Sequence, residues 1–64
     1  MSEQEKLSSL LTDIHGAYAV LTFIEVEYVP CLTNSDWEDL NEAGARIRNL
    51  KEKVEERLKS LNNG

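Results

Sequence analysis

Apolar residues between Leu7 and Val29 recur every three or four positions, and this spacing constrains the fold more than any other feature of the chain. It places them along one side of an α-helix. This stripe consists of Leu7, Leu10, Ile14, Ala17, Leu21, Ile24 and Tyr28. We therefore predict a first helix over about residues 3–29, beginning at a capping box formed by Ser2 and Glu5.

The end of this segment also fits a β-strand. Residues 22–29 are rich in β-branched and aromatic side chains, and apolar residues alternate there with Glu25 and Glu27. We favour the helix, because the helical stripe continues unbroken through Tyr28 and because a single strand would have no partner in the chain.

Pro30 introduces a turn over residues 30–34, because proline lacks an amide donor and disfavours helical backbone in the preceding residue. Ser35 and Glu38 then match a second capping box. A second helix is predicted over about residues 35–61, before the stop signal Asn62-Asn63-Gly64. Its single apolar stripe consists of Trp37, Leu40, Ala43, Ile47, Leu50, Val54, Leu58 and Leu61.

The two stripes match when the chain folds back on itself. In an antiparallel pairing, Tyr28 meets Trp37 at the turn and Leu7 meets Leu58 at the far end, and paired residue numbers add to 64 or 65 throughout. A five-residue turn suits such a helix pair. The predicted fold is therefore all-α, a single helical-hairpin domain over residues 1–64.

One hairpin leaves apolar residues of the first helix uncovered. An exposed apolar patch usually marks an interface. With 64 residues and one cysteine, the chain has a small core and no intrachain disulfide, so oligomerisation is an available means of stabilisation. We therefore predict a homodimer that forms a four-helix bundle. The expected interface residues are Leu11, Tyr18, Val20, Phe23, Val26 and Val29.

Composition indicates a cytoplasmic protein that does not enter membranes. The N-terminus is polar and acidic, unlike a signal peptide. The longest run without Asp, Glu, Lys or Arg, Ile14 to Ile24, has about half the length that a membrane span needs. The net charge of −5 opposes binding to nucleic acid or anionic membranes by the surface as a whole.

Residues that could carry chemistry do not form a recognisable catalytic motif. His15 and Cys31 are the single histidine and the single cysteine, and the hairpin would place them far apart. Glu25 and Glu27 lie two positions apart, so their side chains do not face each other on a helix. We therefore expect no catalytic residues, no cofactor and no metal, and a protein that is not an enzyme.

The second helix carries bases that could contact phosphates, chiefly Arg46, Lys53 and Arg57. Glutamates at 52, 55 and 56 interleave with them, which favours a solvated helix surface. The expected function is a small regulatory or inhibitory protein that binds an unknown protein partner. The alternatives are a nucleic-acid-binding regulator that uses these bases and a small subunit of a hetero-complex.

Overall fold

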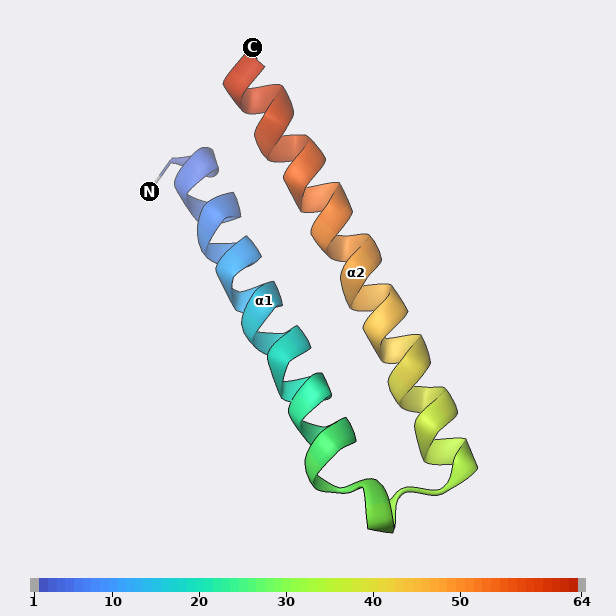
Figure 1. Cartoon of the computed structure of the whole chain (residues 1–64). Helices are drawn as coiled ribbons and strands as arrows, with labels where there is room; N and C mark the ends of the chain where they lie inside the picture. The colour runs from blue at the N-terminus through green and yellow to red at the C-terminus, as the bar shows by residue number, and fades with distance from the viewer. Residues whose placement is uncertain (1, 64) are drawn as a thin grey trace.

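The computed structural model describes residues 2–63, with the side chain of Asn63 excepted, and contains two helices and a short 3₁₀ turn. Helix α1 spans Glu3–Glu27, the 3₁₀ helix η1 spans Val29–Cys31, and helix α2 spans Asn34–Asn63. The two long helices pack side by side and antiparallel, with both chain ends at the same end of the hairpin (Figure 1).

This architecture confirms the predicted all-α hairpin. The described residues contain no strand, and residues 22–27 are helical. Helix α1 ends two residues before the predicted position, and α2 starts one residue earlier and continues two residues further than predicted. Met1 and Gly64, which end the predicted domain and its stop signal, lie outside the described residues.

The start of α1 has the predicted cap. The backbone N–H of Glu5 donates to the hydroxyl oxygen of Ser2 at 3.2 Å, and that hydroxyl donates to the Glu5 carboxylate at 3.1 Å. Glu3 and Glu5 lie in the first turn, where the positive end of the helix dipole stabilises negative charge. Sequence and local structure agree here because all the groups involved lie within four residues.

Helix α1 ends near Pro30 for the expected reason. A proline at position 30 has no amide hydrogen to donate to a carbonyl of the preceding turn, and it disfavours continuation of the α-helix at the residue before it. Val29 instead begins the 3₁₀ helix η1. The chain tightens into η1, where the N–H of Cys31 donates to the Tyr28 carbonyl at 2.8 Å.

The cap of α2 differs from the prediction. Thr33 and Asp36, not Ser35 and Glu38, form the reciprocal pair. The N–H of Asp36 donates to the Thr33 hydroxyl at 3.1 Å, and the N–H of Thr33 donates to the Asp36 carboxylate at 3.0 Å. The shorter aspartate replaces the glutamate of the usual box, and Ser35 becomes part of the first helical turn.

The core lies in the half of the hairpin nearest the chain ends. Among residues 2–62, the buried apolar side chains are Leu7, Ile14 and Val54, and Val54 is completely buried. Leu11, Ile47 and Leu58 pack against them. Among the described side chains, two hydrogen bonds join the helices, from Gln4 to Asn62 at 2.6 Å and from Arg48 to Tyr18 at 3.3 Å.

The seam between the helices contains most of the predicted stripes, since Leu7, Ile14, Leu21 and Ile24 on α1 are buried or half-buried, as are Trp37, Leu40, Ala43, Ile47, Val54 and Leu58 on α2. It departs from the prediction at Leu10 and Leu50. Leu11 is half-buried and Leu10 is exposed on α1, and Lys51 is half-buried and Leu50 is exposed on α2. A single neighbouring helix covers only part of an apolar stripe that is about 100° wide. On α1 it covers Leu11 rather than Leu10.

Tyr18 lies on the side of α1 toward which the seam departs. It lies one helical turn from Ile14 and two from Leu11, whereas the predicted stripe had Ala17 at that level. Turning α1 toward Leu11 and Tyr18 removes more apolar area from water than turning it toward Leu10 and Ala17. It also brings the Tyr18 hydroxyl to Arg48.

Replacing Gly16 with alanine should stabilise the protein. Gly16 lies within α1, has no positive φ, and a Cβ added there meets no atom within 4 Å. The change should raise the free energy of unfolding by about 1 kcal/mol, because alanine restricts the unfolded chain and favours helix. Urea denaturation measures it. Unchanged or lower stability would show that Gly16 is needed for close packing in an assembly.

Candidate interaction surface

The six residues predicted to form an interface do not share one surface. Leu11 is half-buried and packs against the core of the hairpin. Tyr18 is 40% exposed and lies where the two helices meet. Val29 is exposed within η1 at the turn. The remaining three lie on α1, and their exposure is the greatest of the set.

Val20, Phe23 and Val26 form what we call the outer patch of α1. They are 57%, 57% and 72% exposed, respectively. Their positions on the helix turn them away from the seam that contains Leu7, Ile14 and Leu21. The ring of Phe23 meets that of Tyr28 edge-on, with centroids 6.4 Å apart. This pair extends the apolar surface toward the turn.

A groove of about 480 Å³ runs between the helices beside Tyr18 and Arg48. Its floor includes Ile14 and Ile47, and His15 lies at its edge. The Arg48 side chain donates to the Tyr18 hydroxyl, and this hydrogen bond is the main cause that raises the pKa of the guanidinium. Arg48 also lines the neighbouring depression between the helices toward the turn, together with Leu21 and Leu40.

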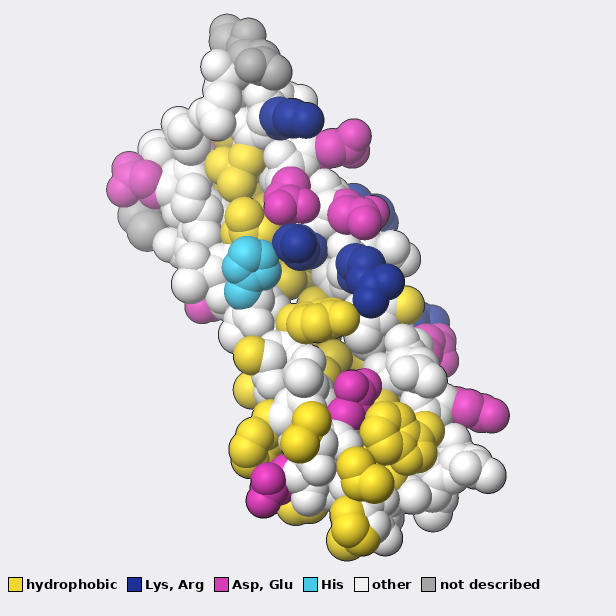
Figure 2. All heavy atoms as spheres, viewed as in Figure 1, with side chains coloured by type: hydrophobic (Ala, Val, Ile, Leu, Met, Phe, Trp, Pro, Cys, Tyr) yellow, Lys and Arg dark blue, Asp and Glu magenta, His cyan; other side chains and the backbone are white. Residues whose placement is uncertain are grey.

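Charged and apolar side chains separate along this face of the molecule. Figure 2 shows the histidine beside Lys and Arg side chains, with Asp and Glu side chains nearby, in the half toward the chain ends. Hydrophobic side chains gather toward the turn in the same view. The turn half is therefore the more suitable end for apolar contact with a partner.

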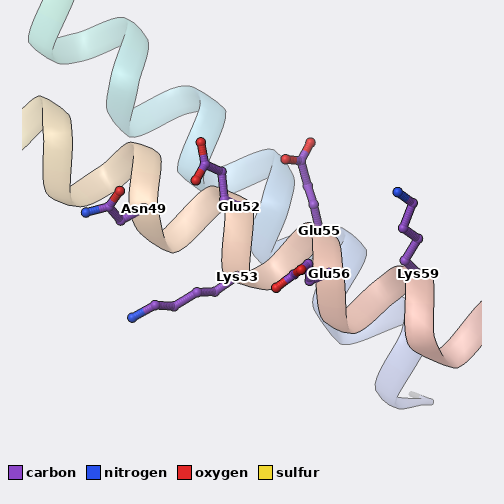
Figure 3. A pocket seen from close by; sticks show the side chains of 6 residues that line it. All are labelled: Asn49, Glu52, Lys53, Glu55, Glu56 and Lys59. Atoms are coloured by element: carbon purple, nitrogen blue, oxygen red, sulfur yellow. The ribbon is translucent and has the colours of Figure 1, made fainter.

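The outside of α2 carries a shallow depression of about 660 Å³ that does not resemble a binding site. Figure 3 shows Glu52 and Glu55 pointing to one side of the helix and Lys53 to the other. Their functional groups do not converge on a common point, which a ligand site would require. We interpret this depression as the space between solvated side chains.

The three bases proposed for phosphate contact are distributed among acids. Arg46 donates to Glu42 at 2.7 Å across one helical turn, and both side chains are largely exposed. Lys53 and Arg57 lie further along α2, where Glu56 shares the same surface depression. The side-chain pattern therefore lacks the continuous positive stripe that favours nucleic-acid binding.

Within the part of the chain that the structure describes, no three His, Cys, Asp or Glu side chains cluster as metal ligands would. Cys31 is a free, exposed thiol in η1. His15 lies near the middle of α1, whereas Cys31 lies in η1, beyond the end of that helix. The two residues therefore belong to separate elements, as expected from the hairpin.

Helix α1 is long and apolar enough to cross a membrane, judged by length and composition alone. The run from Ile14 to Ile24 is too short to span a membrane, whereas a longer stretch of α1 that includes Asp13 is apolar enough. A core helix of a soluble protein meets the same criteria, so this property does not by itself indicate a membrane.

Two side-chain hydrogen bonds between the helices were missing from the sequence-based prediction. The Tyr18–Arg48 and Gln4–Asn62 hydrogen bonds join residues 30 and 58 positions apart. In both pairs the residue numbers add to 66, close to the predicted register. That register, together with the polar residues that it places opposite each other across the seam, was the signal that could have identified them.

Comparisons with protein-family models, curated proteins and solved structures give no match for this chain.

Proposed function

We propose that the protein is a small, non-enzymatic regulator or inhibitor that acts as an acidic helical homodimer and binds another protein. The observation that carries this proposal is the outer patch, Val20, Phe23 and Val26, which the hairpin leaves exposed. Leaving a phenylalanine in water forgoes roughly 1.5–3 kcal/mol of burial. Contiguous exposed apolar residues of this kind mark protein-binding surfaces.

The residues in and around the outer patch indicate the polarity and charge of the surface that would bind it. Glu27 is exposed and lies four residues after Phe23, one helical turn further along the same side of α1. A complementary surface would therefore be apolar at its centre and basic at its rim, since complementary charge favours encounter and excludes wrong partners. The net charge of −5 acts in the same direction.

We infer a protein partner rather than a membrane because α2 accompanies α1 along the hairpin. Hydrogen bonds tie the helices together at Gln4–Asn62 and at Tyr18–Arg48. Inserting α1 into a bilayer would carry the charged α2 with it or break these contacts. Charged side chains at the centre of a bilayer are costly.

Affinity capture from cells that naturally express the protein tests the proposal. Wild-type protein should retain a specific partner, and Phe23→Asp should lose it while remaining helical by circular dichroism. Asn49→Asp, which adds a negative charge on the outside of α2, is the matched control and should retain the partner. Equal retention by Phe23→Asp and wild type would contradict a role for the outer patch.

An electrophoretic shift assay distinguishes the nucleic-acid alternative. We expect no sequence-specific complex at low salt, because acids interleave with the bases of α2 and the chain is acidic overall. A specific complex that is lost on Lys53→Ala would instead support a nucleic-acid-binding regulator.

A further inference from the structure

One side of the hairpin carries apolar residues from both helices at seven-residue spacing. Leu10, Ala17 and Ile24 lie there on α1, and Ala43 and Leu50 lie there on α2. We call this set the heptad face. Seven-residue spacing keeps residues in line along helices that pack nearly parallel to other helices.

The heptad face lies across the seam from the Tyr18–Arg48 groove. Each residue of an α-helix is rotated by about 100° from the previous one. His15 and Tyr18 line the groove on α1. Leu10 and Ala17 therefore lie on the opposite side of the seam. The same rotation separates Leu50 from Arg48 and Glu52 on α2.

The isolated hairpin leaves two leucines of the heptad face exposed. Leu50 is 41% exposed and Leu10 is 38% exposed. A leucine gains free energy on burial. Covering the heptad face would bury both side chains.

The hairpin exposes more surface than a compact monomer of its mass, and the excess is similar to the area that one copy buries in a dimer. The chain exposes 4965 Å², whereas a compact monomer of 7.3 kDa exposes about 4,200 Å². The excess of roughly 800 Å² is the area that each partner buries in a standard interface. The radius of gyration is 14.8 Å, compared with about 11 Å for a compact domain of this length.

We propose that a second copy of this chain packs its heptad face against that of the first. The second copy supplies two helices of the same length and the same repeat, and small residues such as Ala17 and Ala43 leave room for the leucines. This inference rests on the homodimer of the proposed function and assigns its surface. The outer patch stays on the outside of the resulting four-helix bundle, where it remains accessible to a different protein.

Sedimentation equilibrium of matched variants tests the assignment. Leu50→Asp should raise the dimer dissociation constant on the order of 100-fold or more, because each interface would bury an uncompensated charge. Phe23→Asp is the control with the same charge change on the outer patch, and it should dimerise like wild type. Circular dichroism establishes that both variants remain helical.

An isotope-filtered nuclear Overhauser experiment on the wild-type protein tests the same interface even if Leu50→Asp unfolds. Mixed labelled and unlabelled copies should show intermolecular contacts from the methyl groups of Leu10 and Leu50. Alternatively, Phe23→Asp could dissociate the dimer and the intermolecular contacts could come from Val20 and Val26. That result would overturn the assignment of the dimer interface to the heptad face while leaving the homodimer in place. A wild-type monomer at high concentration would overturn both, whereas loss of partner capture alone would leave the heptad face intact.

Discussion

Replacing Ile14 with alanine is expected to lower the free energy of unfolding by about 2–5 kcal/mol, the usual cost of truncating a buried isoleucine. Ile14 is 5% exposed and shares its core with Leu7 and Val54. Because so few side chains are buried, the neighbours that could close the cavity are limited. A domain of this size has little stability in reserve, so the variant should be largely unfolded at 25 °C.

Val20→Ala is the matched control for that experiment. It also shortens a β-branched side chain within α1, but at a position that is 57% exposed. Its effect should stay within about 0.5 kcal/mol, as for most surface changes. Both variants are compared by urea denaturation at equal protein concentration. Equal destabilisation would mean that Val20 is as buried as Ile14 in solution, and the described core would be wrong.

The second large effect is expected on dilution. If folding is coupled to dimer formation, each tenfold fall in concentration costs about 1.4 kcal/mol, and the melting temperature should fall by several degrees. The coupling is expected because a single hairpin leaves Leu10 and Leu50 of the heptad face exposed. Thermal melts followed by circular dichroism from micromolar to millimolar concentration measure the shift.

A variant that cannot dimerise provides the reference for this measurement. Leu50→Asp should melt at a lower temperature that does not depend on concentration. A wild-type melting temperature that is constant over the whole range, together with a high value, would show that one hairpin is stable alone. The apolar surface of α1 would then serve only a foreign partner.

Local features of the fold were predictable because short-range interactions decide them. The three- and four-residue spacing of apolar side chains indicated both helices, and Pro30 indicated the turn between them. The Ser2–Glu5 cap was also identified. The cap of α2 was placed two residues too late, because Thr33 with Asp36 competes with Ser35 and Glu38 over the same few residues.

The candidate surface was less predictable than the helices. Six residues were assigned to one interface, yet Leu11 packs in the core, Tyr18 contacts Arg48, and Val20, Phe23 and Val26 are exposed on the outside of α1. The sequence shows which residues are surplus to one stripe, but not how far a helix turns about its own axis. A rotation that covers Leu11 instead of Leu10 redistributes all of them.

By itself, the sequence determined the number of helices, their approximate bounds and their antiparallel pairing, because each depends on periodicity, caps and a proline that act locally. Only the tertiary structure decided which residues at the edges of each apolar stripe are buried. That choice depends on the summed area and shape of side chains from both helices, such as Tyr18 against Ala17 and the reach of Arg48 to the Tyr18 hydroxyl. It left Leu10 and Leu50 exposed on one side and Phe23 on another, and periodicity alone could not separate these two surfaces.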